Sequence, residues 1–319
     1  MKVLLFTDSG IDDTFALLYA LLHPQINVIG VVADYGNVSR DRAIRNTQYI
    51  LSLVGQEDIP IISGASRPIL GDEPVYYPYV HGVEGFGSII PQQQPKVLYN
   101  FNSIFTLITE SSEPVTIINI GRLTSLSVAF LLHPEILNLV QNIYIMGGAF
   151  LVPGNVTPYA EANIFADPTA ASIVFNNASP LSIRLFPLNV TEKALFSPEI
   201  VQSISQHTTE PIGQFLMNSF QYYYTYYQRQ RPNLNGAPLH DLVAVNAVVN
   251  PQFYKYIQRN VQIIDSSPLG KGITIADLRD RPNIVPTQND FSFIVLDMDY
   301  QKFIQDVHLT FSSYFQSIN

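Results

Sequence analysis

Short runs of apolar, often β-branched residues alternate with longer amphipathic segments along most of this chain. The run at 3–6 predicts a strand and the segment at 14–23 predicts the helix after it; the same succession recurs at 26–33 and 40–54. A strand that is apolar throughout has to be buried on both faces, because a strand with one solvated face alternates apolar and polar residues. The pattern therefore predicts an α/β fold in which helices flank a mostly parallel central sheet.

The alternation continues through the middle of the chain. A strand predicted at 115–120 precedes a helix at 123–132, and a strand at 143–146 precedes a helix at 167–176. The region 253–319 has the pattern of further strands and a closing helix. We expect an open, Rossmann-like sheet, and ligands of such sheets bind at the carboxyl ends of the strands.

Two segments depart from this alternation. Residues 63–99 are rich in Gly, Pro, Tyr and Gln and predict a long loop, which in a compact domain is usually a lid or a binding loop. The region 207–240 holds a tyrosine-rich helix followed by a stretch of helix-breaking residues. Neither segment has the composition of a linker and no internal repeat is present, so we expect one domain spanning 1–319.

Charge and composition exclude several classes of function. The 17 Lys and Arg residues are outnumbered by 26 Asp and Glu, for a net charge of −9, whereas binding to nucleic acid depends on basic contacts. No segment approaches the roughly 18 apolar residues of a membrane span, and the start of the chain has no secretory apolar core. Without cysteine, disulfides and thiolate metal sites are excluded. We expect a cytoplasmic protein that binds neither nucleic acid nor membrane.

Three carboxylates fall within six residues where the first predicted strand gives way to the first helix: Asp8, Asp12 and Asp13. One carboxylate is enough to cap a helix, and clustered carboxylates repel unless a cation neutralises them. Because the chain has no Cys and few His, a hard cation with oxygen ligands, Ca²⁺ or Mg²⁺, would suit the cluster. A helix cap with solvated acids explains the same residues, and the segment alone leaves both interpretations open.

Two later segments carry further polar residues of interest. Asp241 follows His240 directly before an apolar run, and its simplest role is another helix cap. Asn155 and Asn163 flank Glu161, and amides around a single acid suit recognition of hydroxyl groups better than recognition of phosphate. Turns and caps would explain these residues equally well.

Taken together, these segments resemble the inosine-uridine preferring nucleoside hydrolase family, over nearly the whole chain. The specific part of the likeness is the order and spacing of the segments FTDSGIDD (6–13), GN (36–37), HG (81–82), GRLTS (121–125), MGGA (146–149), GNVTPYAEANIFADP (154–168) and LHD (239–241). The resemblance implies a Ca²⁺-dependent enzyme that hydrolyses the N-glycosidic bond of ribonucleosides to ribose and free base. It also implies a homodimer or homotetramer with a role in nucleoside salvage or catabolism.

The resemblance also assigns roles to individual residues. The calcium ligands would be the carboxylates of Asp8, Asp13 and Asp241 and the backbone carbonyl of Thr124. The residues that bind ribose would be Asp12, Asn37, Asn155, Glu161 and Asn163. Asp8 would also take a proton from the attacking water, His240 would assist the departing base, and His81 would lie near the base.

Base recognition has to differ from one branch of the family, which stacks the purine between indole rings, because this chain has no Trp. Tyr223 and Tyr227 are four residues apart and lie on one face of the predicted helix. We predict that one of them contacts the base. The sequence leaves the preferred base open.

Four residues depart from the family pattern. Phe6 stands where the family has its first Asp, which we expect to weaken the ordering around the acidic cluster. Ser9 and Arg122 each replace a Pro, so we expect a less rigid turn and a cation close to Thr124. Ala162 stands where many members have Phe, which predicts a roomier pocket.

The departure at Phe6 favours an alternative, a relative of the same fold that binds nucleosides or other ribosides with weak catalysis or none. The retained acids, together with His240, favour the enzyme.

Overall fold

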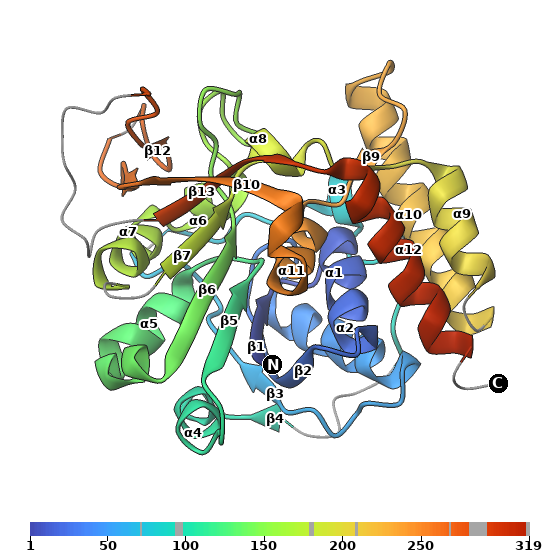
Figure 1. Ribbon diagram of the computed structural model, residues 1–319, viewed down its shortest axis with the longest axis horizontal. Coiled ribbons are helices and arrows are strands. Elements are labelled where there is room, and N and C mark those ends of the chain that lie inside the picture. Colours follow the sequence, from blue (N-terminus) through green and yellow to red (C-terminus); the bar gives the residue numbers. More distant parts are fainter. Residues whose placement is uncertain are drawn as a thin grey trace.

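The computed structural model describes residues 1–70, 72–92, 98–178, 182–207, 210–267, 269–280 and 292–316. A nine-stranded sheet crosses the centre of these residues in the order β10-β13-β7-β6-β5-β1-β2-β3-β4, with helices on both faces (Figure 1). Its strands are β1 (Lys2–Thr7), β2 (Asn27–Ala33), β3 (Ile61–Ser63), β4 (Leu98–Tyr99), β5 (Val115–Asn119), β6 (Val140–Met146), β7 (Ser182–Phe186), β10 (Tyr254–Arg259) and β13 (Ser292–Met298). All neighbours pair in parallel except β10 and β13, which are antiparallel. The predicted α/β class with a mostly parallel sheet is confirmed.

The helices connect these strands in the manner that parallel pairing requires. They are α1 (Ile11–Leu22), α2 (Arg40–Leu53), α3 (Pro78–His81), α4 (Ser103–Thr109), α5 (Thr124–Leu132), α6 (Ala162–Ala166), α7 (Pro168–Asn177), α8 (Leu188–Thr191), α9 (Pro198–Gln206), α10 (Glu210–Gln230), α11 (His240–Val249) and α12 (Tyr300–Gln316). Short 3-10 turns lie at Pro134–Asn138 and Pro251–Phe253. Two small antiparallel pairs join β8 (Leu195–Phe196) to β9 (Ala237–Pro238) and β11 (Gln262–Ile263) to β12 (Thr274–Ile275).

The predicted strands and helices in the first half of the chain are all present, with shifts of a few residues at their ends. The first helix begins at Ile11, three residues before the predicted start, because Asp13 accepts a hydrogen bond from the backbone of Gly10 and so caps the helix. Among the residues of the predicted loop at 63–99 that the structure describes, only α3 is helical, and the segment ends at β4. The single domain over 1–319 stays a prediction.

The sheet separates two apolar cores, and alternate residues of β1 point into each. Val3 and Leu5 pack in the core with α1, α10, α11 and α12, whereas Leu4 and Phe6 pack in the core with α4, α5 and α7. Phe6 is fully buried beside its strand partner Val32. The Phe6 side chain is therefore part of the apolar core on the face of the sheet opposite α1.

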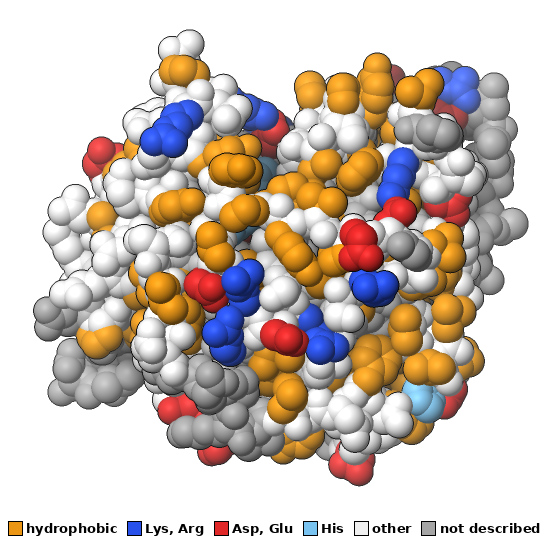
Figure 2. All heavy atoms as spheres, turned by 180° about the vertical axis from the view of Figure 1, so that it is seen from behind, with side chains coloured by type: hydrophobic (Ala, Val, Ile, Leu, Met, Phe, Trp, Pro, Cys, Tyr) orange, Lys and Arg blue, Asp and Glu red, His pale blue; other side chains and the backbone are white. Residues whose placement is uncertain are grey.

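Charged side chains of both signs are interspersed on the face seen in Figure 2. Among the ion pairs of the described residues, Glu84 joins Arg42 and Arg45 at 3.2 and 3.1 Å. No helix in the described ranges combines the length and the apolar content that crossing a membrane requires.

Candidate active site

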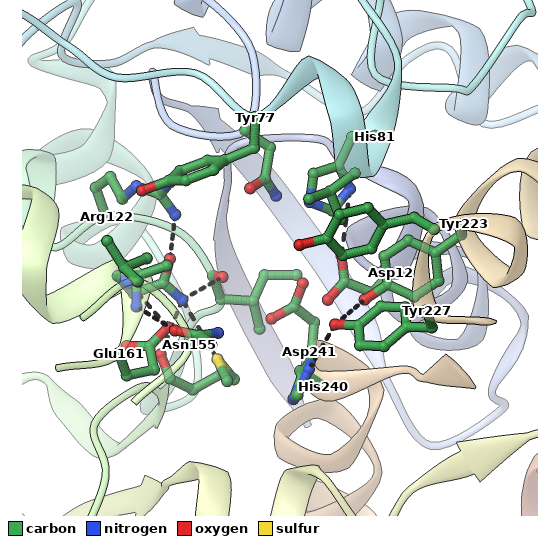
Figure 3. Close-up of a pocket in the computed structure, with 18 residues that line it drawn as sticks. Asp12, Tyr77, His81, Arg122, Asn155, Glu161, Tyr223, Tyr227, His240 and Asp241 are labelled. Atoms are coloured by element: carbon green, nitrogen blue, oxygen red, sulfur yellow. Dashed lines mark hydrogen bonds and ion pairs between the residues drawn. The ribbon is translucent and has the colours of Figure 1, made fainter. Parts of the chain in front are cut away.

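A pocket of about 110 Å³ lies at the carboxyl ends of β1, β5 and β6. Figure 3 shows its two contrasting walls: Arg122, Asn155 and Glu161 on one side, and an aromatic group on the other. The aromatic wall consists of His81, Tyr223, Tyr227 and His240, and Asp241 lies between the two walls. Both the position and the division into a polar and an aromatic half suit a ligand with a polar part and a planar part.

The turn between β1 and α1 is built around Asp13. Its Oδ1 accepts from the Thr7 hydroxyl at 2.6 Å, and its Oδ2 accepts from the Gly10 backbone at 2.8 Å. Ser9 has a φ of +44°, a left-handed conformation that proline cannot adopt because its ring fixes φ near −65°. The Ser9 hydroxyl lies 3.1 Å from that of Thr47, which holds the turn against α2. The turn expected to be less rigid is thus held in place by neighbouring side chains.

Asn37 joins two of the acids from the loop after β2. Its backbone N–H donates to Oδ2 of Asp8 at 2.7 Å and its side-chain amide donates to Oδ2 of Asp13 at 2.9 Å. The preceding residue has to be Gly36, because a Cβ there would come within 1.9 Å of the Asp8 carboxylate. Asn37, expected to bind ribose, lines the pocket and also orients these two carboxylates.

Asp12, Asp13 and Asp241 bring one carboxylate oxygen each to within 4.8 Å of one another, and all three residues are buried. Burial, and then the charge of the neighbouring acids, raises the pKa of Asp12 and of Asp241. Oδ1 of Asp12 has no hydrogen-bond partner among the described residues. Three converging buried carboxylates with an unpaired oxygen suit a hard divalent cation, so the residues fit the Ca²⁺ that the resemblance implies.

Asp8 is bonded differently from these three acids. Its Oδ2 lies 2.9 Å from Nη1 of Arg122, and both side chains are buried. Burial and the charge of Asp13 raise the pKa of Asp8, and the guanidinium of Arg122 opposes that rise. The cation expected near Thr124 therefore pairs with an expected metal ligand.

Thr124 begins α5 and does not line the pocket. Its carbonyl accepts from the Ser127 hydroxyl at 2.7 Å, and its own hydroxyl donates to Asp167 at 2.7 Å. Of the four expected metal ligands, the structure brings Asp13 and Asp241 together. Asp12 is the third acid of that group. Asp8 instead pairs with Arg122, and the Thr124 carbonyl accepts from Ser127.

The polar wall is formed around the start of α6. Glu161 caps this helix by accepting from the backbone of Asn163 at 2.8 Å and of Ile164 at 3.2 Å. The side-chain amide of Asn163 donates to two backbone carbonyls, and its oxygen accepts from Arg122. Asn155 accepts from the backbone of Ala162 at 2.9 Å. Asn155, Glu161 and Asn163 all line the pocket, so three of the five residues expected to bind ribose lie together on this wall, whereas Asp12 belongs to the acidic cluster.

The aromatic wall comes mainly from α10. Tyr223 and Tyr227 lie with their rings 4.9 Å apart, and both border the pocket. The hydroxyl of Tyr227 is 3.3 Å from Nε2 of His240, whose Nδ1 is 2.9 Å from the Thr191 hydroxyl. The four-residue spacing thus puts both tyrosines at the pocket, and the contact of one of them with the base stays a prediction.

Both histidines of this wall are neutral at physiological pH, because burial lowers the pKa of His81 and of His240 to about 3. Nδ1 of His81 accepts from the backbone of Ile11 at 3.1 Å, so the proton of the neutral ring resides on Nε2. As neutral rings they can donate or accept a hydrogen bond, but neither carries a positive charge.

Eight lining residues were not among the predicted site residues, and three of them carry a polar side chain: Tyr77, Tyr226 and Arg122. Tyr77 belongs to the predicted loop at 63–99, and Tyr226 lies in the predicted tyrosine-rich helix. The sequence pointed to both segments but did not identify either residue as part of the site. Arg122 had been noted only as a departure from the family pattern. Its guanidinium lies over the ring of Tyr77, 5.6 Å from the ring centre.

Comparison with known proteins agrees with this geometry. A family model described as inosine-uridine preferring nucleoside hydrolase matches residues 3–305. The chain is 34% identical to the pyrimidine-specific ribonucleoside hydrolase RihA of a Shewanella species, over 86% of both chains. It is 30% identical to the Citrobacter koseri protein of the same name, over 95% of this chain and 96% of that one. Among solved structures, a purine-preferring ribonucleoside hydrolase from Gardnerella vaginalis superimposes with a TM-score of 0.90 at 27% identity, covering 99% of this chain and all of that one (100%).

Proposed function

The chain belongs to the inosine-uridine preferring nucleoside hydrolase family, whose enzymes act on N-glycosyl bonds, and we propose that it hydrolyses ribonucleosides to ribose and a free base with the help of Ca²⁺. The observation that carries this proposal is the buried convergence of Asp12, Asp13 and Asp241 between a polar wall and an aromatic wall. Those three carboxylates would hold the ion, and Asp8 and the Thr124 carbonyl, the other two expected ligands, stay predictions. A divalent cation among them would offset their mutual repulsion, which burial makes costly.

The polar wall would bind the sugar. Asn37, Asn155, Glu161 and Asn163 present amide and carboxylate groups to the pocket and match hydroxyls, which both donate and accept hydrogen bonds. When bound, Ca²⁺ would supply electrophilic assistance at the sugar hydroxyls and the attacking water. A sugar without its 2′-hydroxyl should therefore be a poor substrate.

Asp8 would accept the proton of the attacking water. Its carboxylate is fixed by Asn37 and Arg122 beside the acidic cluster, and fixing an acceptor in advance lowers the entropic cost of the proton transfer. Departure of the base leaves positive charge on the sugar, which the acids around it stabilise. Direct attack by water would invert the configuration at the anomeric carbon.

The aromatic wall would receive the base. Tyr223 or Tyr227 would contact its ring, and His81 would lie beside it. His240, neutral and bonded to Tyr227 and Thr191, would stabilise the departing base by a hydrogen bond. We also propose that the protein is cytoplasmic and acts in nucleoside salvage or catabolism. We further propose that it forms a homodimer or a homotetramer. Sedimentation analysis would measure the mass of the assembly.

The test is release of reducing sugar from inosine, adenosine, guanosine, uridine and cytidine, measured with Ca²⁺ and again with excess chelator. We expect release that the chelator abolishes, and the ranking of the five nucleosides gives the preferred base. Asp241→Asn should lose the activity, while Asp41→Asn, at an exposed acid of α2, should keep it. Binding of nucleosides without any sugar release would overturn the hydrolase in favour of the non-catalytic relative.

A further inference from the structure

Arg122 has hydrogen-bonding capacity that the described protein does not use. Its Nη1 is bonded to Asp8 and to Asn163, but its Nε and Nη2 have no partner among the described residues, although the side chain is only 1% exposed. Buried N–H groups of a charged side chain are expensive to leave unpaired. Since Arg122 lines the pocket, the free groups indicate a ligand oxygen there.

The guanidinium is held in a fixed position. It lies over the Tyr77 ring, its Nη1 is held by two acceptors, and the Arg122 carbonyl accepts from the side chain of Asn119 at 3.3 Å. A donor that is already in place loses little entropy when it binds its partner. Arg122 therefore has the properties of a binding group as well as those of a counter-ion to Asp8.

The charges around Arg122 indicate which kind of ligand oxygen its free N–H groups would bind. Asp12, Glu161 and Asp241 line the same pocket, and among the described lining residues Arg122 is the only Lys or Arg. An anionic ligand would be repelled by the three acids, whereas a neutral hydroxyl would not. Figure 3 places Arg122 on the same side as Asn155 and Glu161, away from Tyr223, Tyr227 and His240. Arg122 thus lies on the wall proposed to bind the sugar and not on the wall proposed to receive the base.

We propose that Arg122 is a sugar-binding residue: its free N–H groups donate to a hydroxyl of the riboside, so that binding depends on a guanidinium and not on the metal alone. This inference rests on the proposed function for the identity of the ligand. In this chain the sugar would be held by two cationic groups, one supplied by the protein and one by the ion.

Titration calorimetry with pseudouridine tests the proposal, because this riboside carries the sugar on a carbon–carbon bond and has no N-glycosidic bond to hydrolyse. The protein is titrated in excess chelator and again with Ca²⁺. We expect binding in both conditions, and we expect Arg122→Met to weaken binding in chelator at least about tenfold, or about 1.4 kcal/mol. Arg122→Lys, which keeps the charge but lacks the planar fork, should show an intermediate loss.

Arg184→Met is the matched control. The Arg184 guanidinium also donates to an asparagine, Asn142, and lies 5.3 Å from the ring centre of Tyr144, but it is outside the pocket. It should leave pseudouridine binding unchanged. Because Arg122→Met leaves Asp8 buried without its cation, the double variant with Asp8→Asn, which removes both charges, is measured alongside. A thermal melt identifies the variants that fold.

Unchanged affinity of the folded Arg122→Met variant, or of the double variant, would overturn the proposal. Arg122-dependent binding of pseudouridine 5′-monophosphate that is tighter than that of pseudouridine would also overturn it, since the group would then serve a phosphate. The two proposals fail separately. If no nucleoside is hydrolysed but pseudouridine binding still depends on Arg122, the hydrolase proposal fails alone. If sugar release is intact and binding ignores Arg122, only the present inference fails.

Discussion

The hydroxyl of Tyr227 lies 3.3 Å from Nε2 of His240 and links the tyrosine-rich helix α10 to the first residue of α11. On the other side of the ring, the Thr191 hydroxyl holds Nδ1. The imidazole is therefore oriented from both ends and, with a pKa lowered to about 3 by burial, it is neutral. An oriented neutral ring can stabilise a leaving base by a hydrogen bond, which gives the first prediction.

His240→Ala should slow the hydrolysis of natural nucleosides by about 100-fold or more, the range found when one hydrogen-bond donor to the transition state is removed. An activated p-nitrophenyl riboside, whose leaving group needs no assistance, should be hydrolysed at nearly the unaltered rate. Steady-state kcat on both substrates measures the difference. Equal losses on the two substrates would remove His240 from any action on the leaving group.

The two tyrosines should act on substrate binding. Replacing both Tyr223 and Tyr227 with Ala removes the rings that border the pocket and should raise KM for the preferred nucleoside about tenfold, as expected for loss of an aromatic contact with the base. Tyr227→Phe keeps the ring and loses only the hydroxyl that contacts His240, so it should lower kcat more than it raises KM. If KM and kcat of the double variant match the unaltered enzyme for every nucleoside, neither tyrosine contacts the base.

Metal removal should make stability depend on pH in a defined direction. The pKa values of Asp12 and Asp241 are raised in the folded protein, so the folded state binds more protons than the unfolded state above pH ~4. These two acids should therefore destabilise the metal-free protein as pH rises, and the loss should be clearest above pH ~7, where His81 and His240 are neutral in both the folded and the unfolded state. Added Ca²⁺ should raise the melting temperature at pH 8.

Asp241→Asn removes one of the repelling charges, so the metal-free variant should be more stable than the metal-free parent at pH 8, and Ca²⁺ should stabilise it less. Differential scanning calorimetry across pH 5–8 with and without the ion compares the two proteins. A metal-free parent that gains stability toward pH 8 would contradict the assignment of these acids as a repelling cluster.

Asp34 gives a second pH-dependent effect away from the pocket. Burial raises the pKa of this carboxyl to about 7, although Oδ1 accepts from the backbone of Ala65 and from the Ser125 hydroxyl. The stability that it contributes in the protonated form is lost as pH rises from ~4 to ~7. Asp34→Asn should be more stable than the parent at pH 8, by up to about 4 kcal/mol, with a smaller difference at pH 5. Urea unfolding at both values measures it, and a difference that shrinks toward pH 8 would refute the raised pKa.

Substitutions at Ser9 test the turn between β1 and α1 that positions Asp8, Asp12 and Asp13. Ser9→Pro, which restores the residue of the family signature, should destabilise by about 3 kcal/mol or more, because proline cannot adopt the φ of +44° and lacks the N–H that bonds Thr7. Ser9→Gly should change the stability by no more than about 1 kcal/mol, because glycine adopts this conformation freely. Chemical unfolding distinguishes them, and a proline variant as stable as the parent would show that the turn accepts another conformation.

The sequence alone was enough to identify the fold class and the main strands and helices of its first half. The periodicity of apolar residues sets which segments become buried strands and which become helices, and the carboxyl ends of parallel strands meet at one edge. The acids after β1 could therefore be expected at that edge, whereas the segment around Glu161 was assigned to the same site only by the resemblance to the nucleoside hydrolases.

Only the tertiary structure decided which groups pair inside the site. Arg122 and Asp8 come from the ends of different strands, and their contact depends on the side-chain directions that packing around the pocket leaves open. The same packing brings Asp12 and Asp13 to Asp241, which is more than 200 residues away along the chain. A sequence pattern specifies which face of an element a residue occupies, but the partner of a buried charge is chosen by every element that surrounds it, and that choice exists only in the folded chain.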